Sequence, residues 1–328
     1  MKAFNCKKPF AYFPVVVAVL VALMASNSGH AAEAAAAPQA NRFTATIAPA
    51  ERFEVDGVLV EQFGPKTGAK GRPLVLIPGL ASGGWVWNET VRAFSADHAV
   101  YVLTLPGFDG RPAAGATPFA TAQAAVNKLI AQRRLDKPVI VGHSLGATMA
   151  VALAEEQPGA IGGVVAIDGL PVFPGTENME AAQRKAMADG MKARMAAANP
   201  QAFAAQQQGY MRAVGVVDMS RADDLAKLTA RSDPASTAQY MADDLLLDLR
   251  PGLKNIQAPV LLIAPWFDLD NTVQGQTITR EIKLDYYRAL MAGTPKLEVI
   301  TVAPARHFAM IDQPQMVNDA IRKYLSAL

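Results

Sequence analysis

The stretch VIVGHSLG, residues 139–146, decides the fold of this chain, because a short β-branched run leads directly into a glycine–serine turn. An alanine-rich segment with helical character follows at residues 147–157. The G-x-S-x-G spacing predicts a strand, a sharp turn and a helix, with glycines where a Cβ atom would collide with neighbouring backbone. Ser144 would stand at the amino end of that helix, where free NH groups favour developing negative charge. It is the candidate nucleophile; the alternative is a buried serine in an ordinary glycine-rich turn.

Strands and helices alternate on both sides of this turn. Largely apolar runs, typical of strands buried in a parallel sheet, occur at residues 74–77, 100–105, 164–168 and 260–263, and we expect a last strand at residues 297–302. Apolar residues at helical spacing occur near residues 89–96, 120–135, 281–291 and 317–325. Two short strands on either side of Asp56-Gly57 would add an antiparallel edge. This order predicts an α/β fold with a mostly parallel central sheet flanked by helices.

The alternation is interrupted at residues 172–255, which contain no convincing strand and are rich in alanine, methionine and glutamine. We expect an inserted helical layer here, which divides the α/β core into residues 43–171 and 256–328. Three methionines of the insert repeat at helical spacing: Met187, Met191 and Met195. They either pack the insert against the core or line a pocket for apolar ligands, and both interpretations can hold.

The first 32 residues are typical of a secretory signal peptide. Three lysines precede an apolar run at residues 10–24, and small residues suited to cleavage follow. The alternative is a retained membrane anchor, but the run is interrupted by proline and shorter than the roughly 20 residues that span a bilayer. We expect export to the periplasm or the medium, cleavage near Ala31 or Ala32, no stable membrane anchor afterwards, and a flexible tether at residues 33–42.

Composition excludes several classes of partner and chemistry. The 328 residues are 51% apolar and 18% charged, as in a globular protein with a substantial core. Without the three signal lysines, 28 basic residues face 29 acidic ones, a formal charge of −1, which gives no indication of a nucleic-acid partner. The only cysteine, Cys6, lies in the signal peptide. No metal-ligand spacing and no G-x-G-x-x-G fingerprint occurs, so we predict neither a metal nor a cofactor.

A serine nucleophile needs a base that takes its proton. Of the four histidines, His30 lies in the signal peptide, His98 lies in a connecting loop, and His143 lies beside the serine on the turn. His307 follows the last predicted strand, at the carboxyl edge where parallel sheets place their sites. His307 is therefore the candidate base.

The base in turn needs a carboxylate that orients its ring. Asp268 and Asp270 both follow the strand at residues 260–263, and Asp168 follows the preceding strand. We choose Asp268 as the acid, with Asp168 as the runner-up and Asp270 as the third candidate.

Backbone NH groups must also stabilise the oxyanion that forms when a serine attacks a carbonyl. Leu145 supplies one, because it follows the nucleophile, and Leu80 supplies the other, because the turn at Gly79 presents its NH group. The residues that we expect around the substrate are Gly79, Trp85, His143 and Trp266.

Five stretches together resemble the α/β-hydrolase fold superfamily, in the branch that carries a helical cap between strands six and seven. They are PGLASGGWVW at 78–87, LPGFDGRP at 105–112, GHSLG at 142–146, LLIAPWFD at 261–268 and RHFAMIDQP at 306–314, within a resemblance that covers residues 52–328. The resemblance implies a triad of Ser144, Asp268 and His307, a structural role for Trp87, and a substrate contact for Trp85. The chain departs from the family at Pro78, where histidine is common, and at Pro265, where glycine is usual.

The resemblance implies a serine hydrolase that cleaves carboxylic esters through an acyl-enzyme intermediate. The signal peptide adds the expectation of export, and the cap and the three tryptophans add that of a largely apolar substrate of moderate size. Serine at the nucleophile position argues against an epoxide hydrolase or a haloalkane dehalogenase, and the lack of an HGGG stretch disfavours the lipase and esterase group that uses it. Four alternatives remain: a C–C bond hydrolase, an amidase, a perhydrolase, and a non-catalytic ligand-binding protein of the same fold. The sequence gives no indication of oligomeric state.

Overall fold

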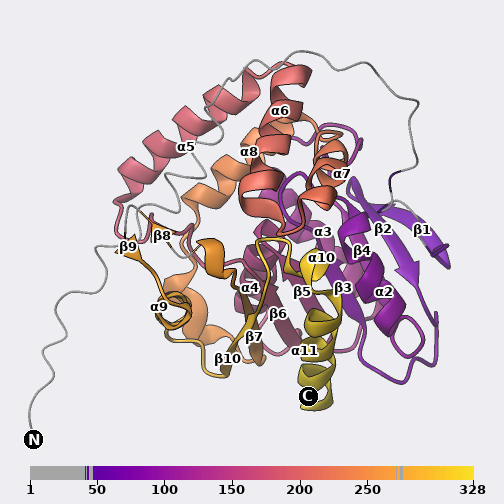
Figure 1. The fold of residues 1–328 in the computed structure, drawn as a ribbon. Coiled ribbons are helices and arrows are strands. Elements are labelled where there is room, and N and C mark those ends of the chain that lie inside the picture. Colours follow the sequence, from indigo (N-terminus) through magenta and orange to yellow (C-terminus); the bar gives the residue numbers. More distant parts are fainter. Residues whose placement is uncertain (1–40, 42, 44–46, 271, 274–275) are drawn as a thin grey trace, which may run out of the picture.

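An eight-stranded sheet forms the centre of the protein in a computed structural model that describes residues 41, 43, 47–270, 272–273 and 276–328 (Figure 1). The strands lie in the order β1-β2-β4-β3-β5-β6-β7-β10. Their bounds are β1 (Glu51–Val55), β2 (Val58–Phe63), β3 (Leu74–Ile77), β4 (Val100–Thr104), β5 (Val139–His143), β6 (Gly163–Ile167), β7 (Val260–Pro265) and β10 (Leu297–Val302). The predicted signal peptide, and all of the predicted tether except Asn41, lie outside the described residues.

Six strands of the sheet run parallel, and β1 and β2 form the predicted antiparallel edge. Asp56 and Gly57, between β1 and β2, both have positive φ, which two-residue hairpin turns of type I′ require. The strands β3 to β7 are buried along their whole length, as their unbroken apolar runs predict. The strand β5 lies between β3 and β6, so the turn that carries Ser144 leaves from the middle of the sheet.

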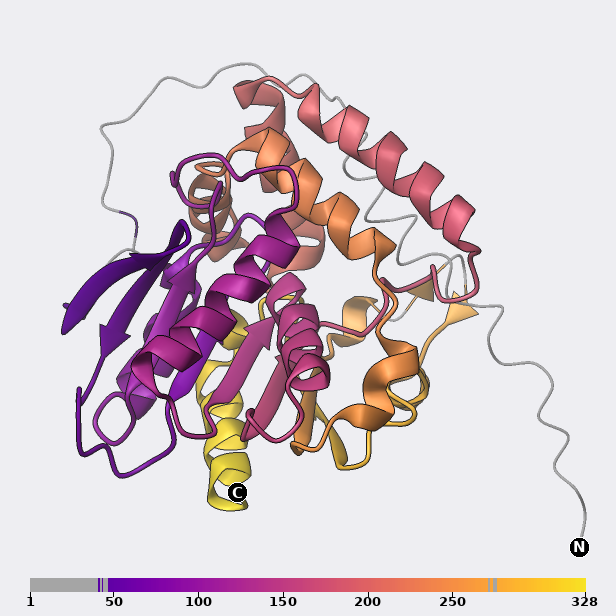
Figure 2. The ribbon, with the colours of Figure 1, turned by 180° about the vertical axis from the view of Figure 1, so that it is seen from behind.

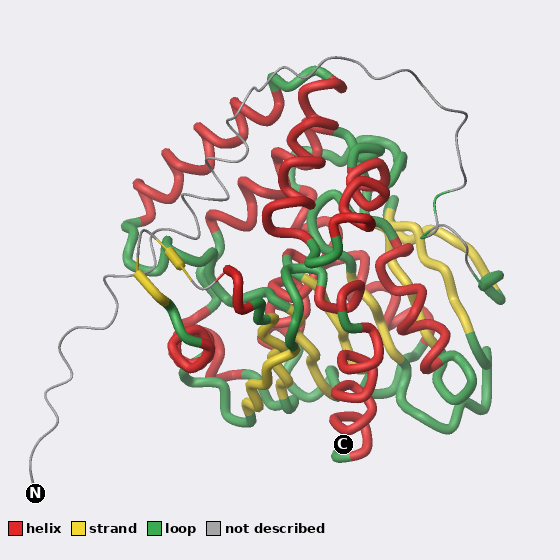
Figure 3. The backbone as a smooth tube through the Cα atoms, viewed as in Figure 1, coloured by secondary structure: helices red, strands yellow, loops and turns green. Residues whose placement is uncertain are grey.

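Helices cover both faces of the sheet (Figures 2 and 3). The core helices are α2 (Asn88–Phe94), α3 (Pro118–Arg133), α4 (Leu145–Glu156), α9 (Arg280–Leu290), α10 (Ala309–Asp312) and α11 (Pro314–Ser326). Short 3₁₀ turns are η2 (Gly84–Trp87), η4 (Arg250–Asn255) and η5 (Asp268–Asp270). Buried side chains of α3, α4 and α9 join one core cluster with one face of the sheet. Those of η2, α2, α10 and α11 join a second cluster with the opposite face. Alternate strand residues therefore enter different cores.

The segment between β6 and β7 is helical. It contains α5 (Ala181–Ala196), α6 (Pro200–Tyr210), the π-helical turn η3 (Met211–Gly215), α7 (Met219–Thr229) and α8 (Pro234–Leu246). We call these elements the cap helices; in Figures 1 and 2 they lie together across one end of the sheet. Met191 and Met195 are both 3% exposed and pack α5 against α8, with Met187 at the edge of the same cluster. Two of the three methionines at helical spacing, Met191 and Met195, thus pack within the cap.

A two-stranded hairpin of β8 (Thr272–Val273) and β9 (Gln276–Thr277) was not predicted. It is too short to produce a pattern of alternating residues. Within the part of the chain that the structure describes, no helix has the length and apolar character needed to cross a membrane.

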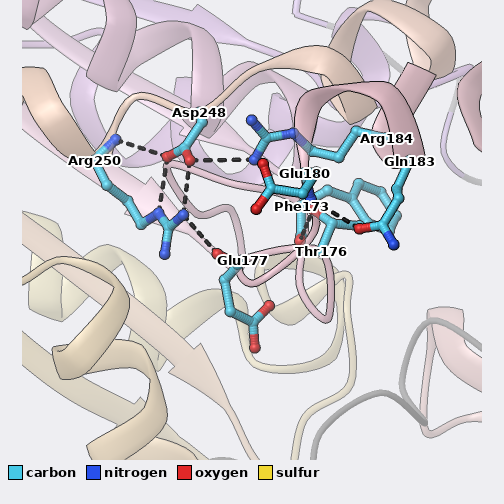
Figure 4. Close-up of polar contacts among 8 residues, drawn as sticks. All are labelled: Phe173, Thr176, Glu177, Glu180, Gln183, Arg184, Asp248 and Arg250. Atoms are coloured by element: carbon cyan, nitrogen blue, oxygen red, sulfur yellow. Dashed lines mark hydrogen bonds and ion pairs between the residues drawn. The ribbon is translucent and has the colours of Figure 1, made fainter.

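The chain enters and leaves the cap through a cluster of ionic contacts, drawn in Figure 4. Val172 forms an isolated antiparallel bridge with Asp248. The Asp248 carboxylate accepts hydrogen bonds from Arg250 Nε at 2.8 Å and from Arg184 Nη1, at the start of α5, at 3.2 Å. Arg250 Nη2 also donates to the Glu177 carbonyl at 2.7 Å. The Asp248 side chain, only 18% exposed, therefore ties the two ends of the cap together.

Removing this carboxylate should destabilise the fold. We expect Asp248→Ala to lower the free energy of unfolding by about 3 kcal/mol, because two partly buried guanidinium groups lose their counter-charge. The hydrogen bond from Arg250 holds the pKa of Asp248 below its ordinary value. Its contribution is therefore present at neutral pH and is lost as the pH falls below the carboxyl group's ordinary pKa. Urea unfolding at pH 7 and pH 3 measures both effects.

The matched control is Asp189→Ala, which breaks the exposed i,i+4 pair with Lys185 on α5 and should change stability little. Equal stability of Asp248→Ala and Asp189→Ala at pH 7 would show that the cluster does not hold the cap.

Candidate active site

Ser144 sits on a strained turn between β5 and α4, as the sequence predicts. Its backbone has φ 53° and ψ −122°, a conformation that L-residues rarely adopt. A Cβ atom at Gly142 would lie 2.1 Å from the carbonyl oxygen of Gly146, and one at Gly146 would lie 2.3 Å from the carbonyl oxygen of Ile77. The two flanking glycines therefore let the turn close against the neighbouring strand.

Adding one methyl group at this turn should be costly. We expect Gly142→Ala to lower the free energy of unfolding by ~3 kcal/mol or to prevent folding, because the contact is with backbone that has little room to move. Gly190→Ala in α5 is the control: its Cβ would meet no atom within 4 Å, and alanine favours helix, so stability should rise slightly. Chemical denaturation compares the two. A Gly142→Ala protein as stable as the parent would contradict the packing.

His307 follows β10 and lies between the serine turn and the cap. Its backbone NH donates to the Val214 carbonyl in η3 at 3.2 Å. Its carbonyl oxygen lies 3.0 Å from His143 Nε2, and the two imidazole rings are 4.6 Å apart. Burial lowers the pKa of His143 well below its ordinary value, so His143 is neutral. His143 therefore braces the segment that carries His307, although its ring also borders the cavity described below.

The carboxylate that meets His307 belongs to Asp168. His307 Nδ1 lies 2.6 Å from Asp168 Oδ2, and the Tyr287 hydroxyl donates to Asp168 Oδ1. The prediction that Asp268 orients His307 is wrong: Asp268 lies in η5 and accepts a hydrogen bond from Trp266 Nε1 at 2.6 Å. The third candidate, Asp270, pairs with Arg306 at 2.7 Å.

The strand ends explain the difference. The strands β6 and β7 are parallel neighbours, with Ile167 beside Ile263, so both candidate acids emerge at the same edge of the sheet. Asp168 is the first residue after β6, and its positive φ of 47° sets the backbone at the strand exit. Asp268 comes three residues after the end of β7, in a 3₁₀ turn. The runner-up Asp168 therefore takes the place beside the base.

A lysine and a tyrosine from α9 keep Asp168 ionised. Burial alone would raise the pKa of Asp168, but the positive charge of Lys283 and the hydrogen bonds from His307 and Tyr287 bring this pKa well below its ordinary value. Lys283 Nζ itself donates to the Pro265 carbonyl at 2.6 Å. An ionised Asp168 favours the His307 tautomer with its proton on Nδ1, which leaves Nε2 free to accept a proton.

The two residues predicted to donate to the oxyanion, Leu145 and Leu80, border the same cavity as Ser144. Leu145 is the first residue of α4, where backbone NH groups have no partner inside the helix. Gly79 lies against the turn: a Cβ atom there would be 2.7 Å from His143 Nδ1 and 3.0 Å from Ser144 Cβ. The close approach of Gly79 brings the following residue, Leu80, to the wall of the same cavity as Leu145.

A cavity of about 520 Å³ lies over these residues, between the core and the cap helices. Ser144, His307 and Asp168 all border it. Much of the remaining wall is apolar and comes from both parts of the fold: Leu170, Val172, Phe173, Met195, Met241, Trp266 and Ile278. Met195 packs within the cap and also borders the cavity, so both interpretations of the three methionines apply to it. Trp266, which we expected around the substrate, is part of the cavity wall.

Trp85 does not reach this cavity. It is 5% exposed and lies in the core cluster of η2, α2 and α11, so the prediction that it contacts substrate is wrong. The physical reason is that η2 packs its side chains onto the sheet. Trp87 is fully buried in the same cluster and has the structural role that the family resemblance implies.

Four further residues border the cavity although the sequence did not indicate them: Lys283, Tyr287, Tyr210 and Asp244. The first two are four residues apart on α9, a spacing that places them on one helix face. Within the described residues, no group of three or more His, Cys, Asp or Glu side chains is arranged to hold a metal ion.

Comparisons with known proteins agree with this architecture. A family model described as the alpha/beta hydrolase family matches residues 74–320. Pimeloyl-[acyl-carrier protein] methyl ester esterase from Aeromonas hydrophila is 30% identical over 116 residues, 35% of this chain and 43% of that relative. The match therefore spans less than half of that relative's length. The protein of the same name from Nitrosospira multiformis is 27% identical over 205 residues, 59% of this chain and 76% of that relative.

Among solved structures, a hydrolase from Pseudomonas aeruginosa shares the fold, with a TM-score of 0.64 and 20% identity over 82% of this chain and 94% of that one. This protein's own structure shows the strand order, the strained serine turn and the helices between β6 and β7 without reference to any other protein. Because the family model also matches most of the sequence, the chain belongs to the alpha/beta hydrolase family.

Proposed function

We propose that this protein is an exported serine hydrolase that cleaves carboxylic esters. One observation carries the proposal: Ser144 on its strained turn and the His307–Asp168 pair border a single, largely apolar cavity. A serine, a histidine held by a buried carboxylate, and backbone NH groups are the parts that acyl transfer requires. The curated relatives, which are named as methyl ester esterases, favour esters among the possible substrates.

The geometry supports a two-step reaction. His307 Nε2 takes the proton of Ser144 Oγ while that oxygen attacks the ester carbonyl carbon, and the NH groups of Leu80 and Leu145 stabilise the oxyanion. The same proton passes to the leaving alcohol oxygen as the C–O bond breaks. Water then gives its proton to His307, attacks the acyl carbon and releases the acid, and the proton returns to Ser144. Asp168 stabilises the imidazolium in both steps.

The cavity sets the scale of the substrate. A volume of about 520 Å³ lies within the range of sites for small organic molecules, and its walls are mostly aliphatic, aromatic and methionine side chains. We infer an ester of moderate size with a largely apolar skeleton.

Stopped-flow hydrolysis of p-nitrophenyl acyl esters tests the proposal. We expect a burst of p-nitrophenol of about one equivalent per chain, because an activated ester acylates Ser144 faster than water removes the acyl group. The matching p-nitroanilide and a vinylogous diketone, run beside the ester, separate an esterase from an amidase and a C–C bond hydrolase. Turnover of the diketone at a higher kcat/KM than any ester would overturn the ester assignment. Tight ligand binding with no turnover of any substrate would favour a binding protein.

The export part of the proposal rests on residues 1–32, with their basic start, apolar run and small residues. Intact-mass analysis of the protein recovered from the periplasm or medium of a bacterial host should give a chain that begins near Glu33. Recovery of an uncleaved chain from the cytoplasm alone would contradict export.

A further inference from the structure

A carboxylate, Asp244, borders the cavity on the cap side. It lies on α8 with Thr237 and Met241, and the three residues are spaced at i, i+4 and i+7. This spacing places them on one face of the helix, and all three border the cavity. The adjacent Asp243 has a different environment: it accepts hydrogen bonds from the Phe119 backbone NH and from Gln239.

Thr148 faces Asp244 from the core. Thr148 follows Ser144 by one turn of α4 and also borders the cavity. Its hydroxyl donates to the Leu170 carbonyl at 3.1 Å, and its proximity lowers the pKa of the Asp244 carboxyl group. A hydroxyl carries a single proton, so a Thr148 hydroxyl that donates to Leu170 has no second proton for Asp244. The Asp244 carboxylate therefore needs a donor from elsewhere.

Among the described residues, none forms an ion pair with Asp244. The two cations on the cavity wall are engaged elsewhere, Lys283 with the Pro265 carbonyl and Arg306 with Asp270. Burial raises the pKa of Asp244 to about 7; the nearby Thr148 hydroxyl opposes this rise, and the negative charge of Asp243 adds to it. A partly buried carboxyl group without a counter-charge is costly unless a proton or a ligand donor satisfies it.

We propose that Asp244 and Thr148 form a polar subsite for a hydrogen-bond donor on the substrate, either a hydroxyl or an amino group. The inference rests on the proposed esterase function and narrows its substrates to esters that carry such a group. The donor lies on the order of 6 Å from the attacked carbonyl, because four residues of α4 separate Ser144 and Thr148 along the helix axis. The apolar walls hold the intervening carbon chain.

Matched esters of equal length test the subsite. We would measure kcat/KM for p-nitrophenyl heptanoate, 6-hydroxyhexanoate and 6-aminohexanoate, and for acetate esters whose alcohol chains carry the same three end groups. The parent protein should favour a donor-bearing ester over its methyl-terminated partner by roughly 10- to 100-fold in at least one series, as expected for one charge-assisted hydrogen bond.

Two substitutions separate the two donors. Asp244→Leu should abolish the preference for either donor. Asp244→Asn should retain part of a preference for the hydroxyl ester, because its amide oxygen still accepts, and should lose a preference for the ammonium ester, because the charge is gone. The control is Asp243→Asn on the same helix, which removes an equal charge but should keep the preference of the parent.

The outcomes distinguish this inference from the function on which it rests. Ester hydrolysis with no preference for a donor-bearing substrate, or a preference unchanged by Asp244→Leu, would overturn the subsite alone. Absence of ester hydrolysis by the folded parent protein would overturn the esterase proposal and the subsite with it. Thermal unfolding of each variant verifies that a lost preference does not come from a lost fold.

Discussion

The Ser144→Ala variant should hydrolyse esters about 10⁶-fold more slowly than the parent protein. The methyl group cannot attack a carbonyl, and the remaining catalysis would come only from binding and from the NH groups of Leu80 and Leu145. The substitution should also relieve little strain, because alanine has the same Cβ atom as serine in the unusual conformation at this turn. Initial rates on p-nitrophenyl esters, with circular dichroism to verify folding, provide the measurement.

Ser326→Ala is the control, because this exposed serine lies at the end of α11. It should retain the parent rate. Residual activity of more than 1% in homogeneous, folded Ser144→Ala protein would show that another group attacks the substrate.

The Asp168→Asn variant should lower kcat by about 10⁴-fold while the fold persists. An amide in place of the carboxylate favours the wrong tautomer of His307 and no longer stabilises the imidazolium that forms in each step. The low pKa of Asp168 in the parent also means that this carboxylate stays ionised at mildly acidic pH. The acid limb of the kcat/KM profile should therefore not report protonation of Asp168.

Comparison with the Asp268→Asn variant shows which of the two aspartates is the acid of the reaction. Its amide oxygen can still accept the hydrogen bond from Trp266 Nε1, so kcat should fall by less than about tenfold. If Asp268→Asn were the more damaging substitution, Asp168 would not be the acid of the reaction.

Sequence patterns predicted the elements that depend on local chemistry. Buried parallel strands produce unbroken apolar runs, and β3 begins and ends at the predicted residues, 74 and 77. The serine turn was predictable because its geometry requires small residues on both sides of Ser144. The position of His307 followed from the general rule that parallel sheets place functional groups after the carboxyl ends of their strands.

The choice of acid depended on information that the sequence pattern does not contain. Asp168 and Asp268 follow adjacent strands, and only the directions of the two loops decide which carboxylate meets His307. Asp168 accepts a hydrogen bond from Tyr287 and is stabilised in its ionised form by the charge of Lys283, and both residues lie more than 100 residues away in the sequence. Trp85 was misplaced for a similar reason, since its spacing in a loop does not reveal which side of η2 packs on the sheet.

We propose that His307 activates Ser144 and that Asp168 holds His307 in place. The asparagine variants of Asp168 and Asp268 test this arrangement directly. The measurement is the rate at which a fluorophosphonate labels the parent, Asp168→Asn and Asp268→Asn proteins, with the modified residue identified by mass spectrometry. We expect a label on Ser144 in all three proteins and a large loss of labelling rate in Asp168→Asn alone. A label on another residue, or equal rates for Asp168→Asn and the parent, would contradict it.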